Sequence, residues 1–208
     1  MLTLSLRGRP RRRHAVSRAA PLLLLTALLL SACGINTIPT LEEHVNAAWS
    51  QVLNQYQRRA DLVPNLVETV RAAAAHERET LEAVTEARAR VGQMQIPSDI
   101  LTNPEAFERF QQLQSQLSSA LSRLLVVAEQ YPQLRANENF LTLQSQLEGT
   151  ENRIAVARRD YIEAVRRYNT ELRTFPGRIW AMIMYRDAEP KQNFTVEEAA
   201  TRAPQVKF

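Results

Sequence analysis

The 208-residue chain has little of several residue types on which small catalytic and binding sites depend. It contains one cysteine, three histidines and five glycines. A single cysteine forms no internal disulfide, so the fold must be stabilised by packing. The glycines stand alone, which excludes a glycine-rich phosphate loop. The longest apolar run, Pro21 to Leu30, is half as long as the roughly 20 residues that a bilayer-spanning helix needs.

The N-terminus has the layout of a secretory signal peptide. Six arginines precede the apolar run, and Ser31, Ala32 and Cys33 follow it, which is the order of charged region, apolar region and small-residue cleavage site. The sequence L-S-A-C at 30–33 resembles the lipobox of bacterial lipoproteins. This resemblance implies cleavage before Cys33, a diacylglycerol on its sulfur and an acyl chain such as palmitate on its new amino group. The alternative is a free thiol behind an uncleaved anchor.

Removal of residues 1–32 changes the charge balance. The six signal arginines belong to the 26 basic residues, so 20 remain against 22 acidic residues, a net charge of −2. The basic character of the precursor therefore gives no reason to expect nucleic-acid binding. Gly34, in place of an aspartate after Cys33, favours the outer membrane over the inner if the host is Gram-negative.

Apolar residues recur at helical spacing through most of the mature chain. The capping box T-L-E-E at 40–43 predicts a first helix that starts at Thr40. Asp61 and Pro64 predict either a break near Ala60, with a second helix running to Gly92, or one kinked helix.

The motif N-P-E at 103–105 predicts the start of a further helix, because asparagine caps, proline suits the first turn and an acid favours the N-terminal dipole. Tyr131-Pro132 ends that helix. The last helix is the most regular and ends at Phe175-Pro176-Gly177. Two rows of its residues recur every seven positions, as in a coiled-coil seam: Phe140, Leu147, Ile154, Tyr161 and Tyr168 in one row, and Leu143, Thr150, Ala157 and Ala164 in the other.

We therefore expect an all-α fold, an elongated antiparallel bundle of three to four long helices with a short C-terminal helical segment and tail. The expected organisation is a cleaved signal peptide at 1–32, a lipidated tether at 33–39, a helical bundle at 40–186 and a polar tail at 187–208. T-V-E-E at 195–198 predicts one short helix in the tail.

Two long stretches are similar to the signatures of the LemA family. They are EEHVNAAWSQVLNQYQRRADLVPNLVETV at 42–70 and ANENFLTLQSQLEGTENRIAVARRDYIEAVRRYN at 136–169. The resemblance implies a helical-bundle domain at the cell envelope and implies no particular activity. Many members of this family keep an uncleaved membrane helix, and the lipobox is a departure from that pattern.

Catalytic and metal-binding constellations are nearly absent from the sequence. His44 and His76 remain after cleavage, and Thr80 stands where a zinc-protease motif starting at His76 needs its second histidine. Residues 41 and 73 are not the glutamates that a di-iron bundle would place three positions before each histidine. A Ser-His-Asp site has no nucleophile-elbow signature here. We therefore predict no metal, no cofactor and no enzymatic activity.

Charged residues gather at the centres of the two signatures: Arg58, Arg59, Asp61, Glu151, Arg153, Arg158, Arg159 and Asp160. They form either interhelical ion pairs that fix helix register or a docking face in which arginines bind carboxylates of a partner. We expect Arg159 to matter more for folding, because it is close to the seam residue Tyr161. We expect Arg59 to matter more for partners, because it borders the predicted break. The row Tyr56, Tyr161 and Tyr168 is interpreted as core.

The apolar segment 179–185 has two interpretations. It closes the end of the bundle, or it places Trp180, Met182 and Met184 against lipid or a membrane protein.

Together these features predict a lipid-anchored envelope protein, facing the periplasm, that acts as a non-catalytic scaffold or adaptor. Its partners would be the membrane, through Cys33, and unknown envelope proteins. The alternatives are an envelope-maintenance enzyme such as a cell-wall hydrolase and a self-assembling coiled coil.

Overall fold

The computed structural model describes residues 34–195, and from Thr37 onward these belong to one compact unit. The helices of this unit are α2 (Thr37–Ala73), α3 (Arg78–Gln93), α4 (Pro104–Ala128), α5 (Pro132–Arg135), α6 (Glu138–Arg173) and α7 (Gly177–Ile183). No strand occurs in this part of the chain, and the predicted all-α fold is confirmed. The signal segment, Cys33 and most of the predicted helix at 195–198 lie outside the described residues. Within residues 34–195, the helices are too short or too polar to cross a membrane.

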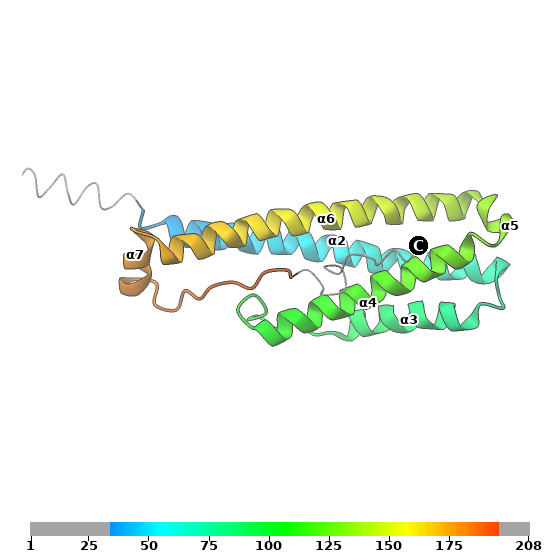
Figure 1. The fold of residues 1–208 in the computed structure, drawn as a ribbon, viewed down its shortest axis with the longest axis horizontal. Coiled ribbons are helices and arrows are strands. Elements are labelled where there is room, and N and C mark those ends of the chain that lie inside the picture. The colour runs from blue at the N-terminus through cyan, green and yellow to red at the C-terminus, as the bar shows by residue number, and fades with distance from the viewer. Residues whose placement is uncertain (1–33, 196–208) are drawn as a thin grey trace, which may run out of the picture. The chain divides into compact units, whose positions relative to one another are not determined.

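The four long helices form an antiparallel bundle. Figure 1 shows α2 and α6 running side by side as one pair and α3 and α4 as the other, and α2 also contacts α3. The short helix α5 connects α4 to α6 at one end, and α7 follows α6 at the other end.

The core of the bundle consists of two hydrophobic clusters that follow one another along its length. The first cluster is aromatic and contains Trp49, Tyr56, Phe107, Phe110, Tyr161 and Tyr168. The second is mainly aliphatic and contains Val63, Leu66, Val70, Leu117, Leu121, Leu124 and Leu147. Because the two clusters are separate, the bundle has a layer between them that apolar side chains do not fill.

Helix α2 differs from the prediction at its start, and at Pro64 it agrees with the continuous helix, one of the two predicted alternatives. It begins at Thr37, so the predicted start at Thr40 is wrong, and Ile38 is buried with 1 % of its surface exposed. The helix also continues through Pro64 without a break. Proline inside a helix costs about 3 kcal/mol, but Pro64 lies on the exposed side while Val63 and Leu66 are buried on the other. Burial of these neighbours keeps the helix continuous.

The segment that was predicted as one helix up to Gly92 is divided by a turn. Helix α2 ends at Ala73, and α3 starts at Arg78 and runs back along the bundle. The turn has backbone hydrogen bonds from Ala74 N–H to the Val70 carbonyl (2.8 Å) and from Glu77 N–H to the Ala74 carbonyl (3.1 Å). No glycine or proline marks this turn in the sequence. The reversal of the chain is fixed by the burial of Ala74 and by the packing of α3 against α2 and α4.

The predictions for α4 and α6 are confirmed. The side chain of Asn103 caps α4 by accepting a hydrogen bond from the Ala106 amide (3.1 Å). The first seven-residue row of α6 is buried throughout, including Ile154, Tyr161 and Tyr168. The second row is buried or half-buried. The heptad pattern therefore identified the face of α6 that packs against α2.

Residues 188–195, which follow α7, run along the bundle as an extended segment that we call the strap. The Gln192 amide donates to the Leu101 carbonyl (2.7 Å), and Asn169 of α6 exchanges two hydrogen bonds with the backbone of Lys191. At the end of the strap Phe194 is buried in the aromatic cluster, with its ring centroid 5.1 Å from that of Phe107. Residues up to 195 of the predicted polar tail are thus packed against the bundle.

Two tyrosines next to the strap differ in their hydrogen bonds, which gives a matched test of its attachment. Tyr161 donates to the Gln192 carbonyl (2.8 Å), whereas the buried Tyr168 hydroxyl has no partner among residues 34–195. Burial, and secondarily the carboxylates of Glu42 and Glu189, raises the pKa of Tyr168 to about 12. We expect Tyr161→Phe to lower the free energy of unfolding by about 1 kcal/mol and Tyr168→Phe to leave it unchanged or slightly raised. Urea denaturation of both variants checks this, and an equal loss in both would contradict it.

Candidate functional site

The layer between the two hydrophobic clusters is polar and centres on Arg59 of α2. Its side chain is 1 % exposed. Along α2 it lies between Tyr56 of the aromatic cluster and Val63 of the aliphatic cluster. A buried charge is costly unless it is paired and hydrogen-bonded, so the partners of this guanidinium decide what the layer does.

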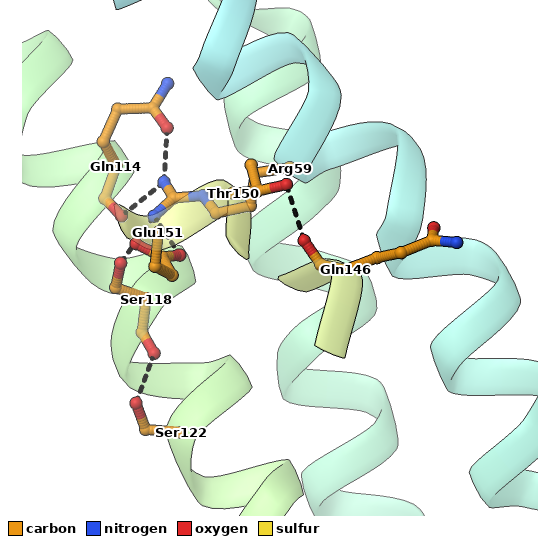
Figure 2. Close-up of polar contacts among 7 residues, drawn as sticks. All are labelled: Arg59, Gln114, Ser118, Ser122, Gln146, Thr150 and Glu151. Atoms are coloured by element: carbon orange, nitrogen blue, oxygen red, sulfur yellow. Dashed lines mark hydrogen bonds and ion pairs between the residues drawn. The ribbon is translucent and has the colours of Figure 1, made fainter. Parts of the chain in front are cut away.

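The guanidinium of Arg59 connects three helices (Figure 2). One terminal nitrogen donates to the Gln114 carbonyl (3.0 Å) and to the Gln114 side-chain oxygen (2.6 Å) on α4. The other donates to the Ser118 hydroxyl (2.6 Å) and to the Glu151 carboxylate on α6 (3.1 Å). Only the Arg59 Nε remains without a partner among residues 34–195. The fork of one arginine therefore fixes α2, α4 and α6 at a common level.

Thr150 completes the layer on the α6 side. It is fully buried, and its hydroxyl donates to the Gln146 carbonyl one turn earlier (2.7 Å), as Figure 2 shows. This bond satisfies the buried hydroxyl within its own helix. Thr150 consequently needs no partner from α2, and α6 can approach α2 closely at this level.

An open pocket of about 410 Å³ lies beside the layer. It is lined by residues of α2, α4, α6 and the strap: Tyr56, Arg59, Gln111, Gln114, Ser115, Ser118, Glu151, Ile154, Arg158, Ile162, Phe194 and Thr195. Two arginines and one glutamate among them give the lining a formal charge of +1. The strap forms one wall, because Thr195 accepts hydrogen bonds from the Gln111 side chain (2.9 and 3.2 Å).

Arg158 supplies the positive charge of the pocket. Its guanidinium lies over the Phe194 ring, 4.4 Å from the centroid. Burial raises the pKa of Tyr56, and the charges of Arg158 and Arg59 oppose that rise. Among the described residues Arg158 has no carboxylate partner, whereas Arg59 has Glu151. The pocket can therefore accept a carboxylate or another hydrogen-bond acceptor.

Comparison with known protein families identifies the family of this chain. The family model described as LemA family matches residues 48–208. The chain belongs to the LemA family. A comparison with curated proteins gave no match. The matched range includes the whole polar layer and the pocket, so both are parts of the LemA region of the chain.

The other charged residues that the sequence singled out in this LemA chain lie at its surface. Arg58, Asp61, Arg153, Arg159 and Asp160 are exposed. Asp61 accepts a hydrogen bond from Gln57 (2.8 Å), and Arg159 pairs with its neighbour Asp160 (3.3 Å). The structure thus brings Arg59, Glu151 and Arg158 together and leaves these five side chains in solvent.

The structural importance that the sequence suggested for Arg159 belongs to Arg59 in the structure. Arg59 is the buried residue, and the side chain of Arg159 is 74 % exposed. Proximity to the seam misled the prediction for Arg159, because a residue two positions before Tyr161 points away from the seam. The predicted break next to Arg59 is absent, since α2 is continuous.

Sequence reasoning missed Gln114, Ser118 and Phe194. Gln114 had a usable signal, because the buried positions of α4 follow a spacing of three and four that runs through it: Phe107, Phe110, Gln114, Leu117, Leu121, Leu124 and Ala128. A glutamine at a seam position indicates a polar layer. Nothing local in the sequence distinguishes Phe194 from an exposed tail residue.

His44 and His76 of this LemA chain are exposed. His44 lines a shallow hollow with Asp160 and Glu163, and hydrogen bonds from Arg166 and Arg167 lower the pKa of Glu163 to about 2. In the described part of the chain no group of three or more His, Cys, Asp or Glu side chains is placed to hold a metal ion. The carboxylates of Asp160 and Glu163 at this hollow are therefore paired with arginines.

Proposed function

We propose that the chain is a lipid-anchored protein of the bacterial cell envelope that acts as a non-catalytic adaptor. The signal segment and the L-S-A-C sequence at 30–33 support the anchor. Membership of the LemA family and the helical bundle are consistent with a protein that presents long helical faces to partners.

The observation that carries the adaptor role is the open pocket next to Arg59, whose lining includes a cation without a carboxylate partner in the described residues. Arginine binds carboxylates through its planar fork, and Arg158 is half-buried at the pocket wall. The strap shows that this part of the bundle already accepts an extended peptide through backbone hydrogen bonds. We therefore propose that the pocket docks an extended segment of an envelope protein that carries a carboxylate.

In-cell photocrosslinking tests this proposal. A photoreactive amino acid replaces Ser115, which lines the pocket, or Ser119, which is exposed on the same helix outside it. We expect a defined crosslinked protein from position 115 and none from 119. Arg158→Gln should remove the crosslink and lower the melting temperature only slightly, because it removes the charge and one cation–π contact with Phe194 but leaves the helices packed. Cys33→Ser should abolish metabolic lipid labelling and leave an unprocessed precursor.

Each part of the proposal has a separate contrary result. A crosslink that survives Arg158→Gln would mean that the pocket charge does not recognise the partner. A crosslinked species made of two copies of this chain would indicate that the pocket serves self-assembly and not the binding of another protein. Normal processing of the Cys33→Ser protein would contradict the proposed lipid anchor.

A further inference from the structure

Helix α7 has apolar side chains on both of its sides, but the bundle covers only one. Trp180 and Ala181 pack against the aromatic cluster. Ile179, Met182 and Ile183, at i, i+3 and i+4, lie on the opposite side and are exposed. Of the two interpretations of this segment, closure of the bundle agrees with the packing of Trp180, whereas contact with lipid or a partner stays open for the other side of α7.

The uncovered side continues beyond both ends of α7. Phe175 and Met184 flank the helix, and with Ile179, Met182 and Ile183 they form what we call the α7 apolar face. Phe175 is 82 % exposed and Met182 66 %. Five large exposed apolar side chains within ten residues are a concentration of the kind that marks an interaction site.

The segment that carries this face is basic. Between residues 173 and 186 the chain has three arginines, Arg173, Arg178 and Arg186, and no acidic residue, while Glu171 lies beside Gly177 and Asp187 follows Arg186. All three arginine side chains are exposed. An apolar face bordered by arginines matches the interfacial region of a membrane with anionic lipids, where each basic residue contributes about 1 kcal/mol.

The face lies at the end of the bundle where α2 begins. Helix α7 contacts α2 and lies beside its first turns in Figure 1. Cys33 is four residues before Thr37, the first residue of α2. Four residues of chain reach at most about 14 Å, so a lipid on Cys33 would hold this end of the bundle at the membrane surface.

We propose that the α7 apolar face lies in the headgroup region of the membrane, against anionic lipid, and sets the orientation of the bundle on that membrane. The proposal rests on the lipid anchor of the proposed function for its location. It adds a second contact, made by the protein itself, to the flexible attachment that a lipid alone gives.

A fluorescence experiment on the full lipidated chain tests this contact. The chain is reconstituted into vesicles of phosphatidylethanolamine and phosphatidylglycerol, with an environment-sensitive fluorophore on a cysteine introduced by Met182→Cys. Diacylglycerol blocks the sulfur of Cys33, so only the new cysteine is labelled. The control is Val126→Cys, an exposed apolar position near the opposite end of the bundle, at the end of α4. We expect emission from position 182 to shift to shorter wavelength and to be quenched by nitroxide-labelled lipids, and emission from 126 to remain unchanged.

Other outcomes overturn the proposal. Water-like emission from position 182 on vesicle-bound protein would mean that the face does not touch the membrane. A shift without nitroxide quenching would mean that protein, such as a second copy, covers it. In a Cys33→Ser, Met182→Cys protein only the new cysteine can be labelled and no lipid is attached, so quenching at 182 in that protein would support the α7 contact while the anchor fails.

The arginines have their own test in the same system. Arg178→Gln together with Arg186→Gln should reduce the quenching at 182 on anionic vesicles and leave it unchanged on phosphatidylcholine vesicles. Equal quenching of both proteins on both membranes would overturn the assignment of these arginines to anionic lipid.

Discussion

Replacing Arg59 by alanine is expected to lower the free energy of unfolding by about 3 kcal/mol, near the lower limit for breaking a buried ion pair. The loss arises because the buried Gln114 side chain and carbonyl lose their donor and the core gains a cavity. Glu151 is 41 % exposed and can be rehydrated, which keeps the loss from being larger. Urea denaturation of the full chain in detergent, followed by circular dichroism, measures the difference.

Two matched variants separate this effect from a general loss of charge. Arg159→Ala removes an exposed arginine from α6 and should change the free energy of unfolding by no more than about 0.5 kcal/mol. Glu151→Gln keeps an acceptor for Arg59 but removes the negative charge, and should cost about 1 kcal/mol. If Arg59→Ala and Arg159→Ala cost the same, the polar layer does not hold the helices together.

Phe194→Ala is expected to have an effect of similar size, with a loss of about 3 kcal/mol. The Phe194 ring is 9 % exposed and lies near the rings of Trp49 (6.2 Å), Phe107 (5.1 Å) and Tyr161 (5.5 Å). Its removal leaves a cavity in the aromatic cluster and releases the end of the strap. Hydrogen exchange should show faster exchange at the Lys191 and Gln192 amides, while the middle of α6 remains protected.

Asn193→Ala is the control for this change, because Asn193 is exposed and adjacent in the strap. Its protection at the Lys191 and Gln192 amides should match that of the unchanged protein, because within the described residues the Asn193 side chain accepts a hydrogen bond from the Phe194 amide alone (3.2 Å). If Phe194→Ala left the strap amides protected, the backbone bonds of the strap alone would hold it, and the ring would not be its anchor.

The polar layer and the strap together define the pocket, which connects stability to the proposed function. Arg158 lies over the Phe194 ring at the pocket wall. A change that releases the strap therefore also removes one wall of the pocket. Loss of partner crosslinking in Phe194→Ala would follow from this geometry, whereas Arg158→Gln removes the charge and leaves the wall in place.

Some properties of this protein were determined by the sequence alone because they depend on local patterns. The cap at Asn103 and the seven-residue rows of α6 each involve residues within a few turns of one another. Such patterns fix which segments are helical and which face of each helix is buried. The polar layer also had a local signal, since Arg59 lies within the regular buried row of α2: Val45, Trp49, Val52, Tyr56, Arg59, Val63, Leu66 and Val70.

Other properties were decided only by the tertiary structure. Continuity of α2 through Pro64 and its turn after Ala73 depend on packing against other helices. The partners of Arg59 are 55 to 92 residues away in sequence, and Phe194 reaches rings on three other segments. A short sequence window contains the side chain but not its neighbours, and burial and pairing are properties of the neighbours. For that reason the sequence identified the charged motifs. The fold decided that Arg59 is buried and paired with Glu151, and that Arg158 lies at the pocket wall without a carboxylate partner among the described residues.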